Sequence, residues 1–180
     1  MPTTLQEIQT FLDEAELKYR VHESRNFLRL CFKSDKYTDT DGDYQMDIVV
    51  ALEEDGEFIK VVVPRAYKFD QNLSSFHKLA LFQTLLHISF QTKMVQFEYD
   101  VDDGEISAII EFPIEDSSLS KKQLLRCIHS MTTLLEKYHE VITDAINHGI
   151  TPEGREQERK AFEEFQRQRR EERRQHLSEG

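Results

Sequence analysis

The stretch VQFEYDVDDGEISAIIEF, residues 95–112, contains two runs of alternating apolar and polar residues, separated by the pair Asp103-Gly104. Successive side chains of a strand point to opposite faces, so this alternation predicts two strands that each bury one face. An Asp-Gly pair between such runs is the strongest short-range signal for a tight hairpin turn. Residues 95–112 therefore predict an antiparallel hairpin as part of a larger sheet.

Three further alternating runs lie upstream, at residues 28–32, 44–52 and 59–63, and Asp55-Gly56 separates the last two. Pro64 follows the third run and is expected to end it, because proline has no N–H to donate to a sheet ladder. These runs predict a three-stranded antiparallel meander. The second face of the last two runs is also apolar, so we expect it to be covered as well. This face supplies two candidate partner-binding residues, Phe58 and Val62.

Three segments follow a helical period instead, at residues 5–15, 72–91 and 120–148. The first and the third begin with a capping box, in which a Thr or Ser is followed three residues later by Glu or Gln. Apolar residues surround most of the middle segment, which predicts that this helix is largely buried. The predicted order of elements is α-β-β-β-α-β-β-α, and the fold class is α+β with an antiparallel sheet.

The helix expected at residues 120–148 carries an apolar stripe with alternating steps of four and three residues. The members of this stripe are Leu124, Ile128, Met131, Leu135, Tyr138, Ile142 and Ala145. A period of 3.5 residues is typical of a helix face that packs on a sheet, and also of a coiled-coil seam between two copies. Both interpretations stay open at this point. The middle of the stripe supplies two further candidate partner-binding residues, Met131 and Tyr138.

The chain has 180 residues and a formal net charge of −11 at pH 7. Residues 151–180 contain eight basic and eight acidic residues, so the whole net charge lies on residues 1–150. An acidic body repels nucleic acid and anionic lipid, which argues against both as partners of this part. The change in composition predicts an α+β domain at residues 1–150 and a charged helical C-terminal extension at residues 151–180.

The extension is charged nearly throughout, apart from a short apolar patch that contains Phe162 and Phe165. Phenylalanines on a charged helix usually dock on the body of the protein or in the groove of a partner, so both are candidate partner-binding residues. The segment RQRREERR, residues 167–174, has a net positive charge. Within it, Arg169 and Arg170 are candidate contacts to an acidic partner or to RNA phosphate.

Two isolated cysteines, Cys31 and Cys127, have no C-x-x-C spacing and are expected as buried thiols in a reducing compartment. The chain contains no run approaching the roughly 18 apolar residues of a membrane span. Its N-terminus also lacks the basic start and apolar stretch of a signal peptide. These features predict a cytoplasmic protein without membrane contact.

The sequence contains no strong motif for catalysis, cofactor binding or metal binding. Apart from the terminal residue, the glycines sit at turns or helix ends, which leaves none for a phosphate-binding loop. Asp39, Asp41 and Asp43 lack the Gly and Glu that an EF-hand loop needs, and Glu136-x-x-His139 occurs once where a carboxylate-bridged metal site needs two copies. The sequence therefore predicts no catalytic, cofactor-binding or metal-ligating residues and no small-molecule substrate. A triad that converges only in three dimensions stays open.

Two segments, VALEEDGEFIKVVVP at residues 50–64 and FEYDVDDGEISAIIEFPIEDSSLSKKQLLR at residues 97–126, resemble the YbjN family of bacterial sensory-transduction regulators. The resemblance includes Leu17-Lys18-Tyr19 at the end of the first helix and Pro113-Ile114-Glu115-Asp116 before the last, and it covers about residues 4–148. It implies the fold of type III secretion chaperones. It also implies a non-enzymatic cytosolic protein, dimeric in the chaperone relatives, that holds segments of other proteins on apolar grooves. The charged extension departs from the family pattern.

The leading hypothesis is therefore a non-enzymatic regulator or chaperone-like adaptor that acts as a homodimer in the cytoplasm and binds a protein partner on apolar surface. One alternative is an RNA- or ribosome-associated factor that acts through the Arg-rich C-terminal helix. Another is an enzyme of unrecognised type. Sharing a fold is weak evidence of a shared function, so the surfaces themselves have to decide between these classes.

Overall fold

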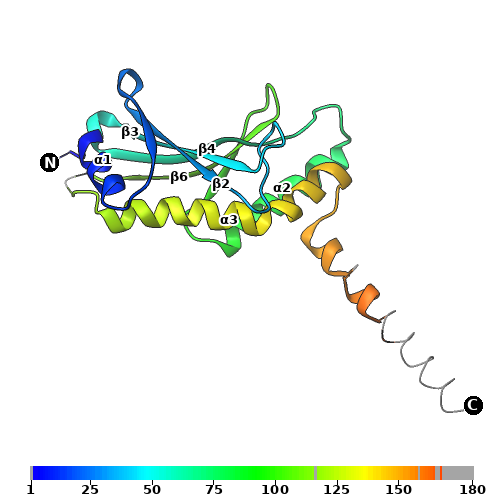
Figure 1. Cartoon of the computed structure of the whole chain (residues 1–180). Coiled ribbons are helices and arrows are strands. Elements are labelled where there is room, and N and C mark those ends of the chain that lie inside the picture. The colour runs from blue at the N-terminus through cyan, green and yellow to red at the C-terminus, as the bar shows by residue number, and fades with distance from the viewer. Residues whose placement is uncertain (1, 116, 158, 165–166, 168–180) are drawn as a thin grey trace, which may run out of the picture.

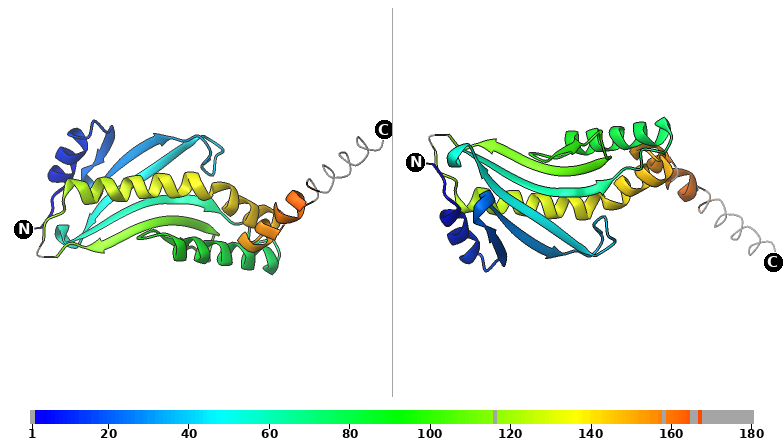
Figure 2. Two further views of the ribbon diagram at one scale, coloured as in Figure 1. Left: turned by 90° about the horizontal axis from the view of Figure 1, so that it is seen from below. Right: turned by 90° about the horizontal axis from the view of Figure 1, so that it is seen from above.

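The computed structural model describes residues 2–115, 117–157, 159–164 and 167. Its elements in chain order are α1 (Leu5–Asp13), β1 (Tyr19–His22), β2 (Phe27–Lys33), β3 (Gln45–Glu53), β4 (Phe58–Lys68), α2 (Ser75–Gln91), β5 (Gln96–Tyr99), β6 (Glu105–Pro113) and α3 (Lys121–His148). Residues 152–157 and 159–164 are also helical. Figures 1 and 2 show α3 running along the length of the strands, with the C-terminal helix projecting from its far end.

The strands form one antiparallel sheet in the order β1-β2-β3-β4-β6-β5, so the protein is an α+β protein as predicted. The β5–β6 hairpin is confirmed, with Phe97 opposite Ala108 and Tyr99 opposite Ile106. Both strands of this hairpin therefore turn alternate side chains toward the core, which is what the alternating sequence requires.

The sheet has one strand more than the sequence predicts, because β1 precedes the meander and pairs with the Phe27–Leu30 part of β2. The expectation that the first helix continues to about Tyr19 is wrong, since α1 ends at Asp13 and Tyr19 begins β1. A strand of four residues with two half-buried side chains is too short to give a readable period.

Pro64 does not end its strand. β4 continues through it to Lys68, and the pairing of β4 with β6 shifts register between Val63 and Tyr67. The next residue, Arg65, has a φ of 50°, so the chain bulges directly after the proline. A bulge leaves a residue without a hydrogen bond to the neighbouring strand. The missing N–H of a proline is therefore least costly at this point of a sheet.

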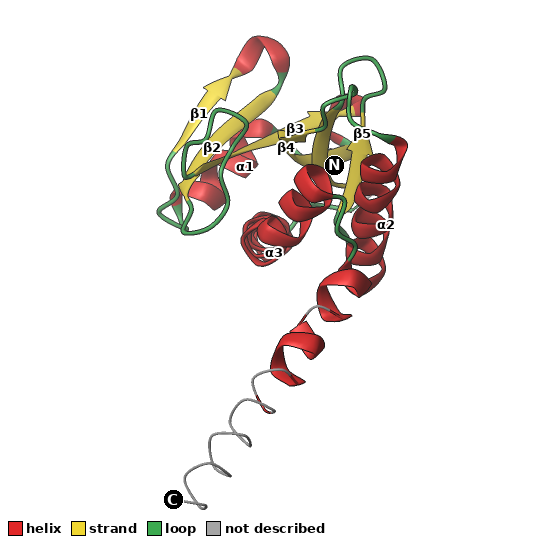
Figure 3. Ribbon diagram, turned by 90° about the vertical axis from the view of Figure 1, so that its right-hand side faces the viewer, coloured by secondary structure: helices red, strands yellow, loops and turns green. Residues whose placement is uncertain are grey.

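α3 packs on the sheet through its apolar stripe, and every member of the stripe from Leu124 to Ala145 is buried. This decides between the two interpretations of the stripe, because its face is already covered by the chain's own sheet. α1 and α2 lie to either side of α3 on the same side of the sheet (Figure 3). The helix ends at Gly149, whose φ of 67° is the left-handed conformation expected for a glycine at this position.

The opposite face of the sheet is not covered by any described element, contrary to the expectation from its apolar residues (Figure 1). Its apolar side chains are half-buried among cross-strand ion pairs, such as Lys60 with Glu111 at 3.6 Å between Nζ and Oε2. The half-buried apolar residues of this face are Val49, Ala51, Phe58 and Val62. Interleaved charges allow the face to remain in water.

Among the described residues, no helix is both long enough and apolar enough to cross a bilayer.

Truncation after Gly149 is expected to lower the free energy of unfolding by less than about 1 kcal/mol, as is usual for surface changes. The reason is that Phe162 keeps 61% of its surface exposed, and the core is formed by residues before the extension. Urea unfolding of the full and truncated chains with equal m-values would measure the difference. A loss of more than about 3 kcal/mol would mean that the extension belongs to the folded domain.

Candidate partner-binding surfaces

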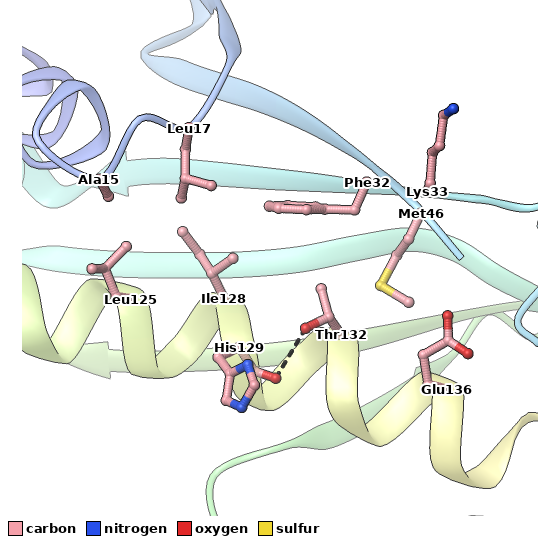
Figure 4. Close-up of a pocket in the computed structure, with 10 residues that line it drawn as sticks. All are labelled: Ala15, Leu17, Phe32, Lys33, Met46, Leu125, Ile128, His129, Thr132 and Glu136. Atoms are coloured by element: carbon pink, nitrogen blue, oxygen red, sulfur yellow. Dashed lines mark hydrogen bonds between the residues drawn. The ribbon is translucent and has the colours of Figure 1, made fainter. Parts of the chain in front are cut away.

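An apolar groove of about 500 Å³ lies between α3 on one side and strands β2 and β3 on the other. It exists because α1 ends at Asp13, so no helix fills the space beside α3 further along β2. The groove is lined by Ala15, Leu17, Phe32, Lys33, Met46, Leu125, Ile128, His129, Thr132 and Glu136 (Figure 4).

Apolar side chains from both walls face one another across this groove. Leu17 and Met46 point toward α3, Leu125 and Ile128 point from α3 toward the strands, and the Phe32 ring lies between them, directed toward Leu17 (Figure 4). Leu17, Phe32 and Leu125 are only half-buried, so the groove presents apolar surface to solvent. Lys33 points outward at the edge of the groove, whereas Thr132 lies on its α3 wall (Figure 4).

Glu136 closes one end of the groove by holding the loop that connects β2 to β3. Its carboxylate accepts hydrogen bonds from the hydroxyl of Ser34 and from the backbone N–H groups of Asp35 and Lys36, the last two at 3.0 Å. We call this arrangement the Glu136 latch. Burial by itself raises the pKa of the carboxyl, but the hydrogen bonds from the loop outweigh burial and hold the pKa below its ordinary value of 4.5.

His139 lies one turn further along α3 and packs behind the same loop. Its ring stacks on Tyr67 with centroids 5.8 Å apart and meets the edge of Tyr37 at 5.4 Å. Burial lowers the pKa of His139 below 6.5, although the carboxylates of Glu136 and Glu140 act in the opposite direction. The Glu-x-x-His spacing thus serves to fix a loop. Within the described ranges, no three His, Cys, Asp or Glu side chains gather where they could hold a metal ion.

A second apolar surface lies on the outward side of α2, and we call it the α2 stripe. It consists of Phe76, Leu79, Gln83, Leu86 and Phe90. The four apolar members expose 63, 57, 71 and 90% of their surface, in chain order. The inward side of the same helix is buried against the domain through Ala80, Leu81, Thr84, Leu85 and Ile88.

The prediction that α2 is largely buried is therefore wrong for its outward half. Apolar residues on both sides of a helix indicate that both sides are buried in the functional protein. They do not indicate whether each side is buried by the same chain or by a partner. For this reason, the sequence pattern did not distinguish these residues as candidate contacts. The α2 stripe could have been found by asking which of the two apolar sides α3 can reach.

The structure does not bring the predicted partner-binding residues of the domain into one surface. Phe58 and Val62 are half-buried on the open face of the sheet. Met131 is fully buried in the core on the other side, and Tyr138 is buried with its hydroxyl donating to Oε1 of Gln91 at 3.2 Å. The groove and the α2 stripe each bring several accessible apolar side chains together.

Only one of the four candidate residues of the extension lies where its side chain can be described. Phe162 is exposed and shares a cleft of about 620 Å³ with His87 of α2. Phe165, Arg169 and Arg170 lie outside the described residues.

Two arginines near the start of the extension face carboxylates. Arg155 contacts Asp144 at 3.0 Å and Glu140 at 3.7 Å between side-chain N and O atoms. Arg159 contacts Glu156 and Glu163, both at 2.9 Å. These guanidinium groups are therefore already paired within the chain, and an RNA contact would rest on the residues beyond them.

Both cysteines are free thiols, and only one is buried as predicted. Burial raises the pKa of the Cys127 thiol to about 11, which makes it unreactive at neutral pH. Cys31 is exposed on β2, because its side chain points to the open face of the sheet.

No protein-family profile matches the chain, and neither does any curated protein. Solved structures resemble it at low sequence identity. The HopA1–SchA chaperone–effector complex contains a chain with 14% identity and a TM-score of 0.46, over 74% of this chain and 88% of that one. The heterodimeric ExoU–SpcU complex from the type III secretion system of Pseudomonas aeruginosa gives 15% identity and 0.44, over 78% and 98%. An uncharacterized protein from Methanothermobacter thermautotrophicus gives 16% and 0.46, over 79% and 98%.

Proposed function

We propose that this chain is a non-enzymatic, chaperone-like adaptor of the YbjN family that holds a segment of another protein. The observation that carries the proposal is the apolar groove beside α3, in which Leu17, Phe32 and Leu125 are half-buried and open to solvent. A groove of about 500 Å³ with an apolar floor and a polar edge is suited to side chains of a partner segment.

The dimensions of the groove favour a peptide segment over a small ligand. Its α3 wall runs from Leu125 to Glu136, which is roughly 16 Å at 1.5 Å per residue. That length accommodates about three helical turns or about five extended residues. An elongated apolar groove can accept several apolar side chains spaced along a peptide, whereas one compact molecule would fill only part of it.

The charge of the domain selects among partner segments. Residues 1–150 carry the whole net charge of −11, so a segment with basic residues beside its apolar anchors is attracted at long range. Electrostatic attraction of this type acts mainly on the association rate and weakens with salt. The proposed partner is therefore a protein segment with apolar anchors and a basic flank.

Replacing Leu125 with Glu is expected to weaken the binding of such a segment by about 30-fold or more, because a carboxylate at the apolar wall would have to be desolvated. Peptides selected from a random library on the full-length chain supply the probe, and fluorescence anisotropy measures their affinity. Val101→Glu is the matched control, because Val101 is 70% exposed in the β5–β6 turn, away from the groove. Peptides that bind both variants equally, or a library that yields no binders, would overturn the proposal.

We further propose that two copies of the chain associate, since large exposed apolar patches on a soluble domain are usually covered by a partner. The α2 stripe supports this proposal, because four large side chains on one helix are 57 to 90% exposed. We place the protein in the cytoplasm. An exposed free thiol at Cys31 is typical of a reducing compartment.

A further inference from the structure

A further cleft lies between the middle of α3 and the C-terminal end of α2, and we call it the Lys137 cleft. Its volume is about 310 Å³, which is at the small end of the range for ligand cavities. α3 forms one wall, and the other wall is formed by the last residue of α2 and the connection from α2 to β5. The two walls come from separate parts of the chain, so no local sequence pattern indicates the cleft.

The floor of the Lys137 cleft is apolar and held in place by the protein. It consists of Val95, Leu134 and Tyr138, which are all buried. The hydroxyl of Tyr138 donates to Oε1 of Gln91 at 3.2 Å, across the junction of α3 and α2. This hydrogen bond joins the two walls, so the cleft is already formed without a ligand, and binding does not have to order it.

Two ammonium groups stand at the rim of the cleft, those of Lys93 and Lys137. Both residues are exposed, and within the described part of the chain neither takes part in an ion pair. Nζ of Lys137 lies 4.7 Å from the centroid of the Tyr138 ring, which places this positive charge beside the apolar floor. Both charges are therefore available to an anion in the cleft.

The Lys137 cleft differs in charge from the rest of the domain. Of the described residues that line it, none is Asp or Glu, although residues 1–150 carry a net charge of −11. The acidic residues of α3 on either side of Lys137 are engaged elsewhere. Glu136 holds the loop between β2 and β3, and Glu140 forms ion pairs of its own at 3.7 and 3.9 Å. The electrostatic potential in the cleft is therefore set mainly by its two ammonium groups.

Hydroxyl groups on the α3 wall add hydrogen-bond donors beside these charges. Ser130 and Thr133 both line the cleft, and a hydroxyl can donate to the oxygen of an anion. Oγ1 of Thr133 lies 3.4 Å from Nε2 of His129, which lines the cleft as well. The rim thus combines positive charge with neutral donors, and the floor offers apolar contact.

We propose that the Lys137 cleft binds a small phosphate monoester, with the phosphate at Lys93 and Lys137 and the organic part on the apolar floor. A phosphate monoester carries a charge of about −1.5 to −2 near neutral pH, which two ammonium groups balance. Lysine binds phosphate as a point charge, whereas a carboxylate is matched best by the planar fork of an arginine, and none of the described lining residues is Arg. This site goes beyond the proposed adaptor function and does not depend on it.

The groove and the Lys137 cleft lie on opposite flanks of α3. The groove is bounded by β2 and β3, and the cleft is bounded by the end of α2 and its connection to β5. His129 lines both, and its ring is directed away from Leu17 and Met46 of the groove (Figure 4). A phosphate monoester in the cleft therefore leaves the groove open to a partner segment.

Phenyl phosphate is the probe, and backbone amide NMR shifts of the isotope-labelled full-length chain report its binding. The amides of Lys93, Ser130 and Thr133 are expected to shift and to saturate at about 1 mM or below. Lys93→Glu and Lys137→Glu should each weaken binding about 10-fold or more, because each replaces an attracting charge by a repelling one. Lys18→Glu makes the same change in net charge beside α1, on the other side of α3, and should keep the affinity within about twofold.

All three lysines are exposed, so the circular dichroism of these variants should match that of the native chain. A titration that leaves the amides of the cleft unshifted would overturn the proposal. Equal weakening by Lys18→Glu and Lys137→Glu would also overturn it, because the effect would then come from net charge alone. Shifts confined to the groove, for example at Leu125, would place the compound in the groove and equally refute the site.

Two fragments of the probe separate the roles of the charge and the floor. Inorganic phosphate lacks the ring and phenol lacks the charge, so each should bind about 10-fold or more weakly than phenyl phosphate. Raising NaCl from about 50 to about 300 mM should weaken the binding of phenyl phosphate but not of phenol. Phenol that binds as tightly as phenyl phosphate, or inorganic phosphate that does so, would contradict the proposal. Peptide binding by the groove is measured separately with Leu125→Glu, so the two proposals can fail independently.

Discussion

Replacing Gly56 with Ala is expected to lower the free energy of unfolding by about 3 kcal/mol, which places it among the most damaging single changes. A Cβ at this position would lie 2.1 Å from the backbone O of Thr3, a distance that atoms cannot adopt. Gly56 also has a φ of 95°, where residues with side chains are strained. The N-terminal segment would have to move away and lose the hydrogen bond from the N–H of Thr3 to the carbonyl of Gly56.

The contact can be separated from the backbone strain by a second glycine. Gly42 has a φ of 89°, close to that of Gly56, but among the described atoms none comes within 4 Å of the Cβ position. Gly42→Ala should therefore cost only about 1 kcal/mol, the price of the strained conformation alone. Urea unfolding with equal m-values measures both variants. Equal losses at the two positions would contradict the packing of the N-terminal segment over Gly56.

Replacing Glu136 with Ala is expected to cost about 2 kcal/mol, because the Glu136 latch is lost and three loop donors lose a charged acceptor. The loop that connects β2 to β3 should then exchange its amide hydrogens faster at Asp35 and Lys36. Glu140→Ala is the matched control one turn away. The Glu140 side chain is 62% exposed, and its ion pairs with described residues are long, at 3.7 and 3.9 Å, so its loss should change stability little.

The latch also predicts a pH dependence with a definite sign. Because the folded-state pKa of Glu136 lies below its ordinary value of 4.5, the ionised carboxylate stabilises the folded state. This contribution is complete above about pH 4.5 and is lost as the pH falls through the folded-state pKa. The stability difference between the native chain and Glu136→Gln should therefore shrink as the pH falls below about 4.5, in the range where the Glu136 carboxylate itself titrates. A difference that grew between about pH 4.5 and about pH 3 would show that the carboxylate does not hold the loop.

The limits of sequence-based prediction are clearest at β1 and at the groove. β1 has only four residues, and its place in the sheet is fixed by pairing with Phe27–Leu30 of β2, a contact that no local pattern encodes. The groove combines Leu17 and Phe32 with Leu125, more than ninety residues away along the chain. Its existence depends on how far α1 extends over β2, which is a consequence of packing. For the same reason, Glu136 and His139 could be noticed as a pair but not assigned to the loop that they hold.

The sequence by itself determined the periods and the end signals of the main elements. The alternation of residues 95–112 specifies the β5–β6 hairpin, and the capping boxes and Gly149 specify where α1 begins and where α3 begins and ends, because these are local properties of the backbone. Which apolar face meets the chain's own core was decided only by the tertiary structure. The stripe of α3 and the belt of α2 are equally apolar in sequence, yet α3 is buried on the sheet whereas α2 keeps Phe90 in water. Burial depends on what lies opposite a face in space, and the sheet reaches across α3 but does not wrap around α2.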